Sequence, residues 1–163
     1  MKAFQLKQEM WSLGGHFTIS DEFGIPNYQV MGSFLHIPKT YSIKDMEGNL
    51  VSQIEKEFFS FLPKFKVHLA CGQDFILRKD MTLLKPRYHI DNLNMIIQGD
   101  LWDMDFNLIQ EDKVLAKISQ EWLNVSSIYN IEVHEEALSD LVISLVVAID
   151  CVKEMEGGTS RGS

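Results

Sequence analysis

A triplet of an aromatic, a polar and an aliphatic residue recurs along the chain. Within each triplet the outer two residues share one face and the middle residue takes the other, which is the period-two alternation of a half-buried β-strand. The spacings between successive triplets are 24, 24, 23, 18 and 23 residues, which indicates one supersecondary unit used many times. The six triplets begin at Phe17, Tyr41, Phe65, Tyr88, Phe106 and Tyr129.

Turn-forming residues and a second alternating segment follow five of these triplets. Gly, Asp and Asn tolerate the backbone of tight hairpin turns, and they gather at 21–24, 45–49, 70–72, 91–92 and 111–112. Partner strands are expected at 28–34, 50–58, 75–79, 95–99 and 114–122, the last with Trp122 on its inward face. With an opening strand at 4–8 and a closing strand at 129–133, the pattern predicts about twelve strands, too many for a flat open sheet.

One long apolar segment follows the strands and predicts a helix over 137–155. Leu138, Leu141, Leu145 and Ile149 lie along one face, but the opposite face is also largely apolar, so the helix is expected to be buried nearly all round. Only nine uncharged residues separate Asp140 from Asp150. They span about 13 Å of helix, whereas a bilayer core is about 30 Å thick.

These patterns together predict a mainly β (α+β) protein. We expect a closed antiparallel barrel of about twelve strands around a buried, hydrophobic C-terminal helix. The domain is expected to span residues 1–156, and 157–163, which begins with two glycines, to form a disordered tail.

Composition narrows the class of partner and the compartment. The chain has 163 residues and a net charge of −8, which argues against nucleic-acid binding. The two cysteines fit no metal spacing, and neither a signal peptide nor a transmembrane segment is visible. A cytoplasmic protein, at most peripheral at a membrane, is therefore expected.

Several longer stretches resemble the LURP-one-related family, a branch of the tubby C-terminal-like superfamily. Their order and spacing run from about residue 3 to residue 155, and they lie at 12–19, 58–65, 85–90, 99–106 and 145–150. The resemblance implies a twelve-stranded barrel around a central helix, related to phospholipid scramblases. Tubby domains bind phosphoinositide head groups and scramblase relatives act on phospholipids, but the LURP-one branch itself implies no enzymatic activity.

The first candidate site is a basic segment. Residues 64–87 carry a local balance of +4 in a chain that is otherwise strongly acidic. If these side chains converge, they are suited to a phosphate or an anionic phospholipid head group. If they do not, they are solvated charges on the outer face of the strands. The candidate residues are Lys64, Lys66, Arg78, Lys79, Lys85 and Arg87.

The second candidate is the acidic cluster of Asp100, Asp103 and Asp105. Carboxylates near a turn can bind calcium, which takes six to eight oxygen ligands. The cluster lacks the spacing of a calcium-binding loop, so carboxylates that accept hydrogen bonds from the backbone of the turn are the favoured interpretation.

The remaining chemistry favours a protein without a cofactor. His16, His36, His68, His89 and His134 have no metal-ligand spacing, and no nucleophile elbow, phosphate loop or dinucleotide motif is present. A helix inside the barrel would also leave no deep central pocket. We therefore expect a non-catalytic binding or scaffold domain that recognises a lipid head group or, alternatively, a protein partner. A scramblase-like or other enzymatic activity is the least favoured alternative.

Overall fold

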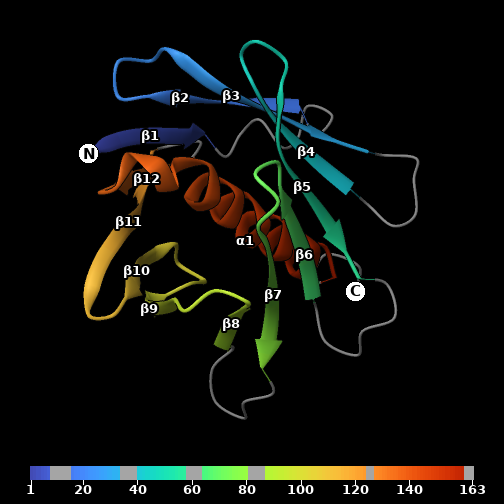
Figure 1. Cartoon of the computed structure of the whole chain (residues 1–163), viewed down its shortest axis with the longest axis vertical. Coiled ribbons are helices and arrows are strands. Elements are labelled where there is room, and N and C mark those ends of the chain that lie inside the picture. Colours follow the sequence, from blue (N-terminus) through green and yellow to red (C-terminus); the bar gives the residue numbers. More distant parts are fainter. Residues whose placement is uncertain (8–15, 34–39, 58–63, 81–86, 124–126, 160–163) are drawn as a thin grey trace.

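The computed structural model describes residues 1–7, 16–33, 40–57, 64–80, 87–123 and 127–159. Twelve strands form one antiparallel sheet that curls around a single long helix, α1 (Figure 1). The strands are β1 (Lys2–Lys7), β2 (His16–Asp21), β3 (Pro26–Gly32), β4 (Thr40–Asp45), β5 (Leu50–Lys56), β6 (Lys64–Leu69), β7 (Asp74–Asp80), β8 (Arg87–Asp91), β9 (Ile96–Asp100), β10 (Asp105–Gln110), β11 (Lys113–Trp122) and β12 (Ser127–Val133).

The sheet is a nearly closed barrel. Its strand order is β8-β7-β6-β5-β4-β3-β2-β1-β12-β11-β10-β9. The N-terminal strand β1 therefore pairs, along its whole length, with β12, the last strand in the sequence. The ends of the sheet are β8 and β9, which follow each other in the chain and lie near each other but form no ladder among the described residues. The predicted barrel is thus confirmed, with a seam between these two strands.

The hairpin predicted across Asp91 and Asn92 is therefore wrong. The turn itself forms, and Asn92 has a φ of 71°, but the strands on either side of it do not pair. Leu93 and Met95 pack against the core. We infer that their burial holds this connection against the interior and keeps β9 away from β8.

The recurring triplet explains the barrel interior. The six triplets fall on the six even-numbered strands, and both the aromatic and the aliphatic residue of every triplet are buried. The polar residue between them faces outward and is at least partly exposed. The alternation along the sequence is therefore the alternation between the inside and the outside of the barrel.

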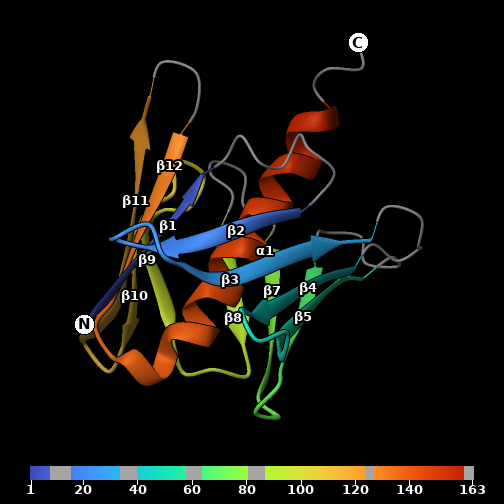
Figure 2. The same cartoon turned by 90° about the horizontal axis from the view of Figure 1, so that it is seen from above.

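α1 (Ser139–Thr159) lies along the barrel axis, as Figure 2 shows from a second direction. Every residue from Leu141 to Val152 is buried, which confirms the predicted central helix. The helix begins later than predicted, because Ala137 belongs to a short 3-10 turn at Glu136–Leu138. It also continues through Gly157 and Gly158, since glycine disfavours a helix by only about 1 kcal/mol.

No helix in the described ranges is both long and apolar enough to cross a membrane. Residues 160–163 of the predicted tail lie outside the described residues.

Polar contacts fix the position of α1 inside the apolar tube. The Tyr28 hydroxyl donates to Asp140 at 2.9 Å near the start of the helix. One turn later, the Ser144 hydroxyl lies 2.6 Å from that of Ser52 on β5, and both serines are fully buried. These contacts can form at only one position of α1 along and around its own axis, whereas apolar packing alone would allow several positions.

Trp122 departs from the prediction, because it is 75% exposed rather than part of the core. It pairs with Ser127 at the far end of β11, beyond the point where the neighbouring strand β10 begins at Asp105. An inward register buries a side chain only where the rest of the barrel surrounds it. Trp11 lies outside the described residues.

Candidate functional site

The outer face of β6 and β7 brings together three of the predicted basic residues. Lys64 and Arg78 are directly opposite each other in the β6–β7 ladder, and Lys66 follows on the same face of β6. Their side chains are between 30% and 42% exposed. This set of three residues is called the β6–β7 basic face below.

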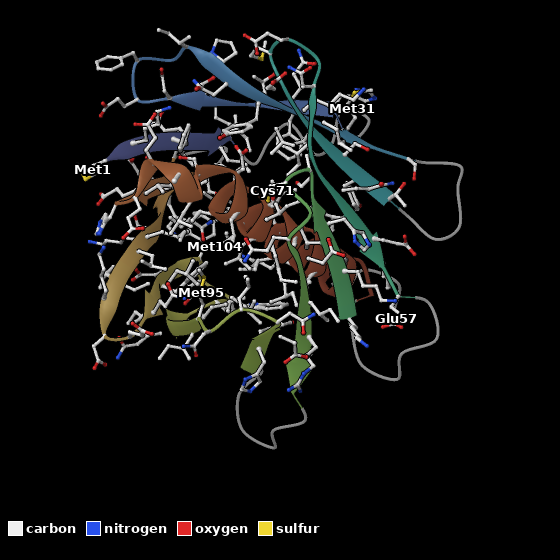
Figure 3. The ribbon with its side chains drawn as sticks, in the orientation of Figure 1. Met1, Met31, Glu57, Cys71, Met95 and Met104 are labelled. Carbon is white, nitrogen blue, oxygen red and sulfur yellow. The ribbon has the colours of Figure 1, made fainter. Side chains whose placement is uncertain are left out.

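Each cation of the β6–β7 basic face lies next to a carboxylate. Glu57, which follows β5, forms ion pairs with Lys64 at 2.9 Å and with Lys66 at 3.6 Å. Figure 3 labels Glu57 at this end of β5. Arg78 donates from Nε to Asp91 at 2.7 Å. The hydrogen bond from Lys64 is the main cause that lowers the pKa of Glu57, so this carboxylate is ionised at neutral pH. The positive charge of the β6–β7 basic face is therefore largely neutralised by these carboxylates.

Of the other predicted basic residues, only Lys79 has a described side chain, and it lies on the opposite side of the sheet from this face. Lys79 is opposite the buried Tyr88 in the β7–β8 ladder, and it lies two residues after the buried Leu77, on the same side of β7. Lys79 thus has the inward register and is only partly exposed. Arg87 begins β8 opposite Asp80, and the position of its side chain is not described. Lys85 lies outside the described residues.

The acidic cluster is arranged by the turn between β9 and β10. The Asp100 carboxylate accepts hydrogen bonds from the backbone N–H groups of Trp102 at 2.9 Å and Asp103 at 3.0 Å. This is the turn-stabilising role favoured from the sequence. Asp105 is opposite Asp100 in the ladder and is exposed, as is Asp103. No group of three or more potential metal ligands occurs in the part of the chain that the structure describes.

The histidines with described partners make ordinary surface contacts. His68 Nδ1 lies 2.9 Å from the Asp74 carboxylate across the β6–β7 ladder. The Nδ1 atom of His134 lies 3.0 Å from the Val114 carbonyl oxygen. His16 and His89 are exposed, and His36 lies outside the described residues.

A polar cluster near the C-terminal end of α1 was missed in the sequence. The Tyr129 hydroxyl donates to Asp150 at 2.8 Å, and both residues are fully buried. The Lys153 ammonium lies 5.5 Å from the centre of the Tyr129 ring. Burial lowers the pKa of Lys153, whereas the negative charges of Asp150, Asp103 and Asp100 oppose this effect. The only sequence signal was a carboxylate in the middle of an apolar helix.

This cluster compensates charge within the barrel. Lys153 is one helical turn after Asp150 and lies on the same side of the helix, so a cation accompanies the buried carboxylate. Tyr129 adds a hydrogen bond to the carboxylate and a ring face to the cation. The cluster completes the row of polar contacts that begins with Tyr28 and Ser52.

Comparison with known proteins agrees with this architecture. A family model described as LURP-one-related matches residues 2–150. The uncharacterized protein YxjI of Bacillus subtilis is 28% identical over 144 residues, which cover 88% of each chain.

The fold also has a counterpart among solved structures. The X-ray structure of a protein from Arabidopsis thaliana superposes with a TM-score of 0.62, at 13% sequence identity, over 93% of this chain and 90% of the other. This likeness concerns the fold alone. Since the family model spans nearly the whole barrel and most of α1, the chain belongs to the LURP-one-related family.

Proposed function

We propose that this chain is a non-catalytic binding domain that acts through the outer wall of its barrel. The observation that carries the proposal is the position of α1. Its residues from Leu141 to Val152 are buried on all sides, so the barrel axis is filled by the protein's own side chains. A small substrate usually binds in a concave pocket that buries most of its surface. Contacts on the wall suit a macromolecule or a membrane surface instead.

The proposed main partner is a protein. The β6–β7 basic face carries its own carboxylates, which weakens its attraction for an anionic membrane. The sheet, in contrast, ends in two strands, β8 and β9, that no ladder joins among the described residues, and a strand edge is a recurring site of peptide recognition.

A phospholipid head group is a second candidate for one specific reason. Lys64 and Arg78 are direct cross-strand neighbours, and Lys66 extends the same face. A phosphate that replaced the Glu57 carboxylate between the two lysines would meet the same donors. Such a contact would be peripheral and reversible.

Vesicle binding tests the lipid candidate. We predict that Glu57→Gln increases binding to vesicles rich in anionic phospholipid by several-fold at low salt, because it releases two lysines from their ion pairs. The triple variant Lys64→Glu, Lys66→Glu, Arg78→Glu should abolish that binding. The matched control reverses Lys7, Lys113 and Lys117, which are exposed on other strands. Equal binding by all four proteins would reject the lipid candidate.

Turnover assays test the absence of catalysis. Tyr129 and Asp150 form a fully buried, hydrogen-bonded pair of ionisable side chains, so this pair is where an unrecognised activity would be sought. We expect purified protein to hydrolyse no ester, phosphoester or phospholipid substrate above the buffer rate. Turnover that is present in the native protein and lost in Tyr129→Phe would overturn the proposal.

A further inference from the structure

β9 is one of the two edge strands of the sheet. It pairs with β10 on one side, and within the described residues no strand pairs with its other side. Ile96 is 64% exposed, and Gln98, Gly99 and Asp100 are exposed as well. The backbone N–H and C=O groups along such an edge are strong donors and acceptors, and another extended segment can pair with them.

β9 carries less of the protection that edge strands usually have than β8, the strand at the other end of the sheet. Proteins discourage unwanted pairing with lysine, proline or inward-pointing charges on the edge strand. The segment from Asn92 to Gly99 contains neither a proline nor a charged residue. The opposite end of the sheet differs, because β8 carries Arg87, His89 and Asp91 at its outward positions. The edge at β9 is therefore less protected than the edge at β8: its only charged residue is Asp100 at the end of the strand, and its backbone is irregular at Gly99, where φ is +129°.

The side chains on the outer face of β9 and β10 change in chemical character along the two strands. Three outward cross-strand pairs follow one another along the ladder: Ile96 with Ile109, Gln98 with Asn107, and Asp100 with Asp105. The face thus changes from apolar through amide to acidic over the length of β9. Residues opposite each other across strands are the unit of interaction in a sheet. The alternate side chains of an added strand would lie beside this gradient, defined as the change from apolar through amide to acidic residues from Ile96 to Asp100.

We propose that β9 binds an extended segment of a partner protein by strand addition, with a basic residue opposite Asp100, a polar residue opposite Gln98 and an aliphatic residue opposite Ile96. The inference rests on the proposed function and specifies its partner. An antiparallel segment would therefore read basic, polar and aliphatic at alternate positions from its N-terminal end. Between them, the residues opposite Gly99 and Ile97 face the barrel interior and are apolar.

The gradient distinguishes this partner from a second copy of the chain. Antiparallel pairing of β9 with itself about Gln98 would set the aliphatic Ile96 of each copy against the Asp100 of the other. Neither the apolar contact nor the charge pairing would then be formed. The two adjacent carboxylates of Asp100 and Asp105 favour a cationic segment.

The experiment uses a synthetic peptide with this pattern, TKVTVIT, acetylated and amidated, titrated into the isotope-labelled full chain and followed by NMR. In antiparallel pairing its lysine falls opposite Asp100 and its isoleucine opposite Ile96. We expect backbone amide shifts that centre on Ile96–Asp100. A peptide methylated at alternate backbone nitrogens, which removes donors without changing side chains, should not bind. Shifts distributed elsewhere, or none at the solubility limit, would overturn the inference.

Two variants test the register. Ile96→Lys introduces an edge lysine at an exposed position and should reduce peptide affinity about tenfold, whereas Phe23→Lys, at another exposed position on the β2–β3 turn, should leave it unchanged. The double variant Asp100→Asn, Asp105→Asn keeps a side-chain oxygen for the turn. It should lower affinity for the lysine peptide about threefold and remove its advantage over TEVTVIT. An unchanged preference would contradict the proposed orientation.

These outcomes separate the inference from the proposed function. Failure of the peptide to bind, with vesicle binding that depends on the β6–β7 basic face, would reject strand addition and retain a binding domain. Catalytic turnover that depends on Tyr129 would reject the binding-domain proposal itself.

Discussion

Two tyrosines donate hydrogen bonds to two aspartates of α1, but the surroundings of the two carboxylates differ. Asp140, the acceptor for Tyr28, is exposed near the start of the helix, whereas Asp150, the acceptor for Tyr129, is fully buried. When the donor to a buried carboxylate is removed, the carboxylate oxygen loses its hydrogen bond and water cannot easily replace it. The two hydroxyls are therefore expected to contribute unequally.

We predict that Tyr129→Phe lowers the free energy of unfolding by about 2 to 3 kcal/mol and Tyr28→Phe by about 1 kcal/mol or less. Urea denaturation at pH 7 measures both, and each substitution removes only a hydroxyl oxygen. A larger loss for Tyr28→Phe would mean that the solvent-facing end of α1, rather than the buried carboxylate, determines its position.

Gly99 is required by close backbone packing as well as by its conformation. Its φ is +129°, and a Cβ atom built there would lie 2.5 Å from the Asp105 carbonyl oxygen. Gly72 also has a positive φ, of +88°, but nothing lies within 4 Å of its Cβ position. We expect Gly72→Ala to destabilise by about 1 to 2 kcal/mol through backbone strain alone. Gly99→Ala should cost clearly more, and equal losses in thermal unfolding would refute the packing argument.

Glu57 links stability to pH. Its pKa is lowered in the folded protein from the ordinary value of 4.5, chiefly by the hydrogen bond from Lys64. A carboxylate with a lowered folded pKa stabilises the fold above its unfolded pKa and loses this effect as pH falls through the folded pKa. Glu57→Gln should therefore be less stable than the native chain at pH 7 and approach its stability in acid, once the pH has fallen below the lowered pKa of Glu57. Urea midpoints at the two pH values test this, with Glu121→Gln as the control; a gap that persists in acid would contradict it.

At the scale of elements, α1 is the part most sensitive to charge. Leu145 is fully buried in the middle of the helix. An unpaired carboxylate there would cost several kcal/mol against a total stability of about 5 to 15 kcal/mol. We predict that Leu145→Asp does not fold, while Ala137→Asp, at an exposed position before the helix, melts like the native chain. A soluble Leu145→Asp protein with a cooperative transition would disprove the central-helix packing.

The strands and the helix could be predicted because their signals are local. Each triplet needs only three adjacent residues to reveal its inward face, and α1 reveals its burial by having apolar residues on every side. Trp122 shows the limit of this reasoning. Its register is inward, but whether an inward position is covered depends on where the neighbouring strand ends.

The candidate site was less predictable, because its counterions come from outside the segment that suggested it. The basic balance was found over residues 64–87, and the ion-pair partners of Lys64 and Arg78 are Glu57 and Asp91, just before and just after that segment. Hairpin connections bring both carboxylates onto the β6–β7 basic face. A local count of charge along the chain cannot include residues that only strand pairing brings together.

For the molecule as a whole, the seam predicts an uneven distribution of local stability. β12 lies inside the sheet between β1 and β11, whereas β9 pairs with β10 alone in the part of the chain that the structure describes. Amide hydrogens in paired and covered strands exchange through larger openings than those of an exposed edge. We expect amides in β12 to exchange at least 100-fold more slowly than those of β9. Similar protection in the two strands would show that the seam is closed in solution and would also argue against strand addition.

The order of the elements along the chain has a consequence for synthesis on the ribosome. α1 follows all twelve strands in sequence, yet every strand except β9 contributes buried side chains to the core in which it lies. β1, the first strand in the sequence, pairs along its whole length with β12, which is synthesised last of the strands. A nascent chain in which only the strands have emerged therefore exposes the apolar inner face of each one without the helix that covers it. We expect the complete barrel to assemble only after translation has passed Val152, and the nascent strands to be prone to aggregation until then.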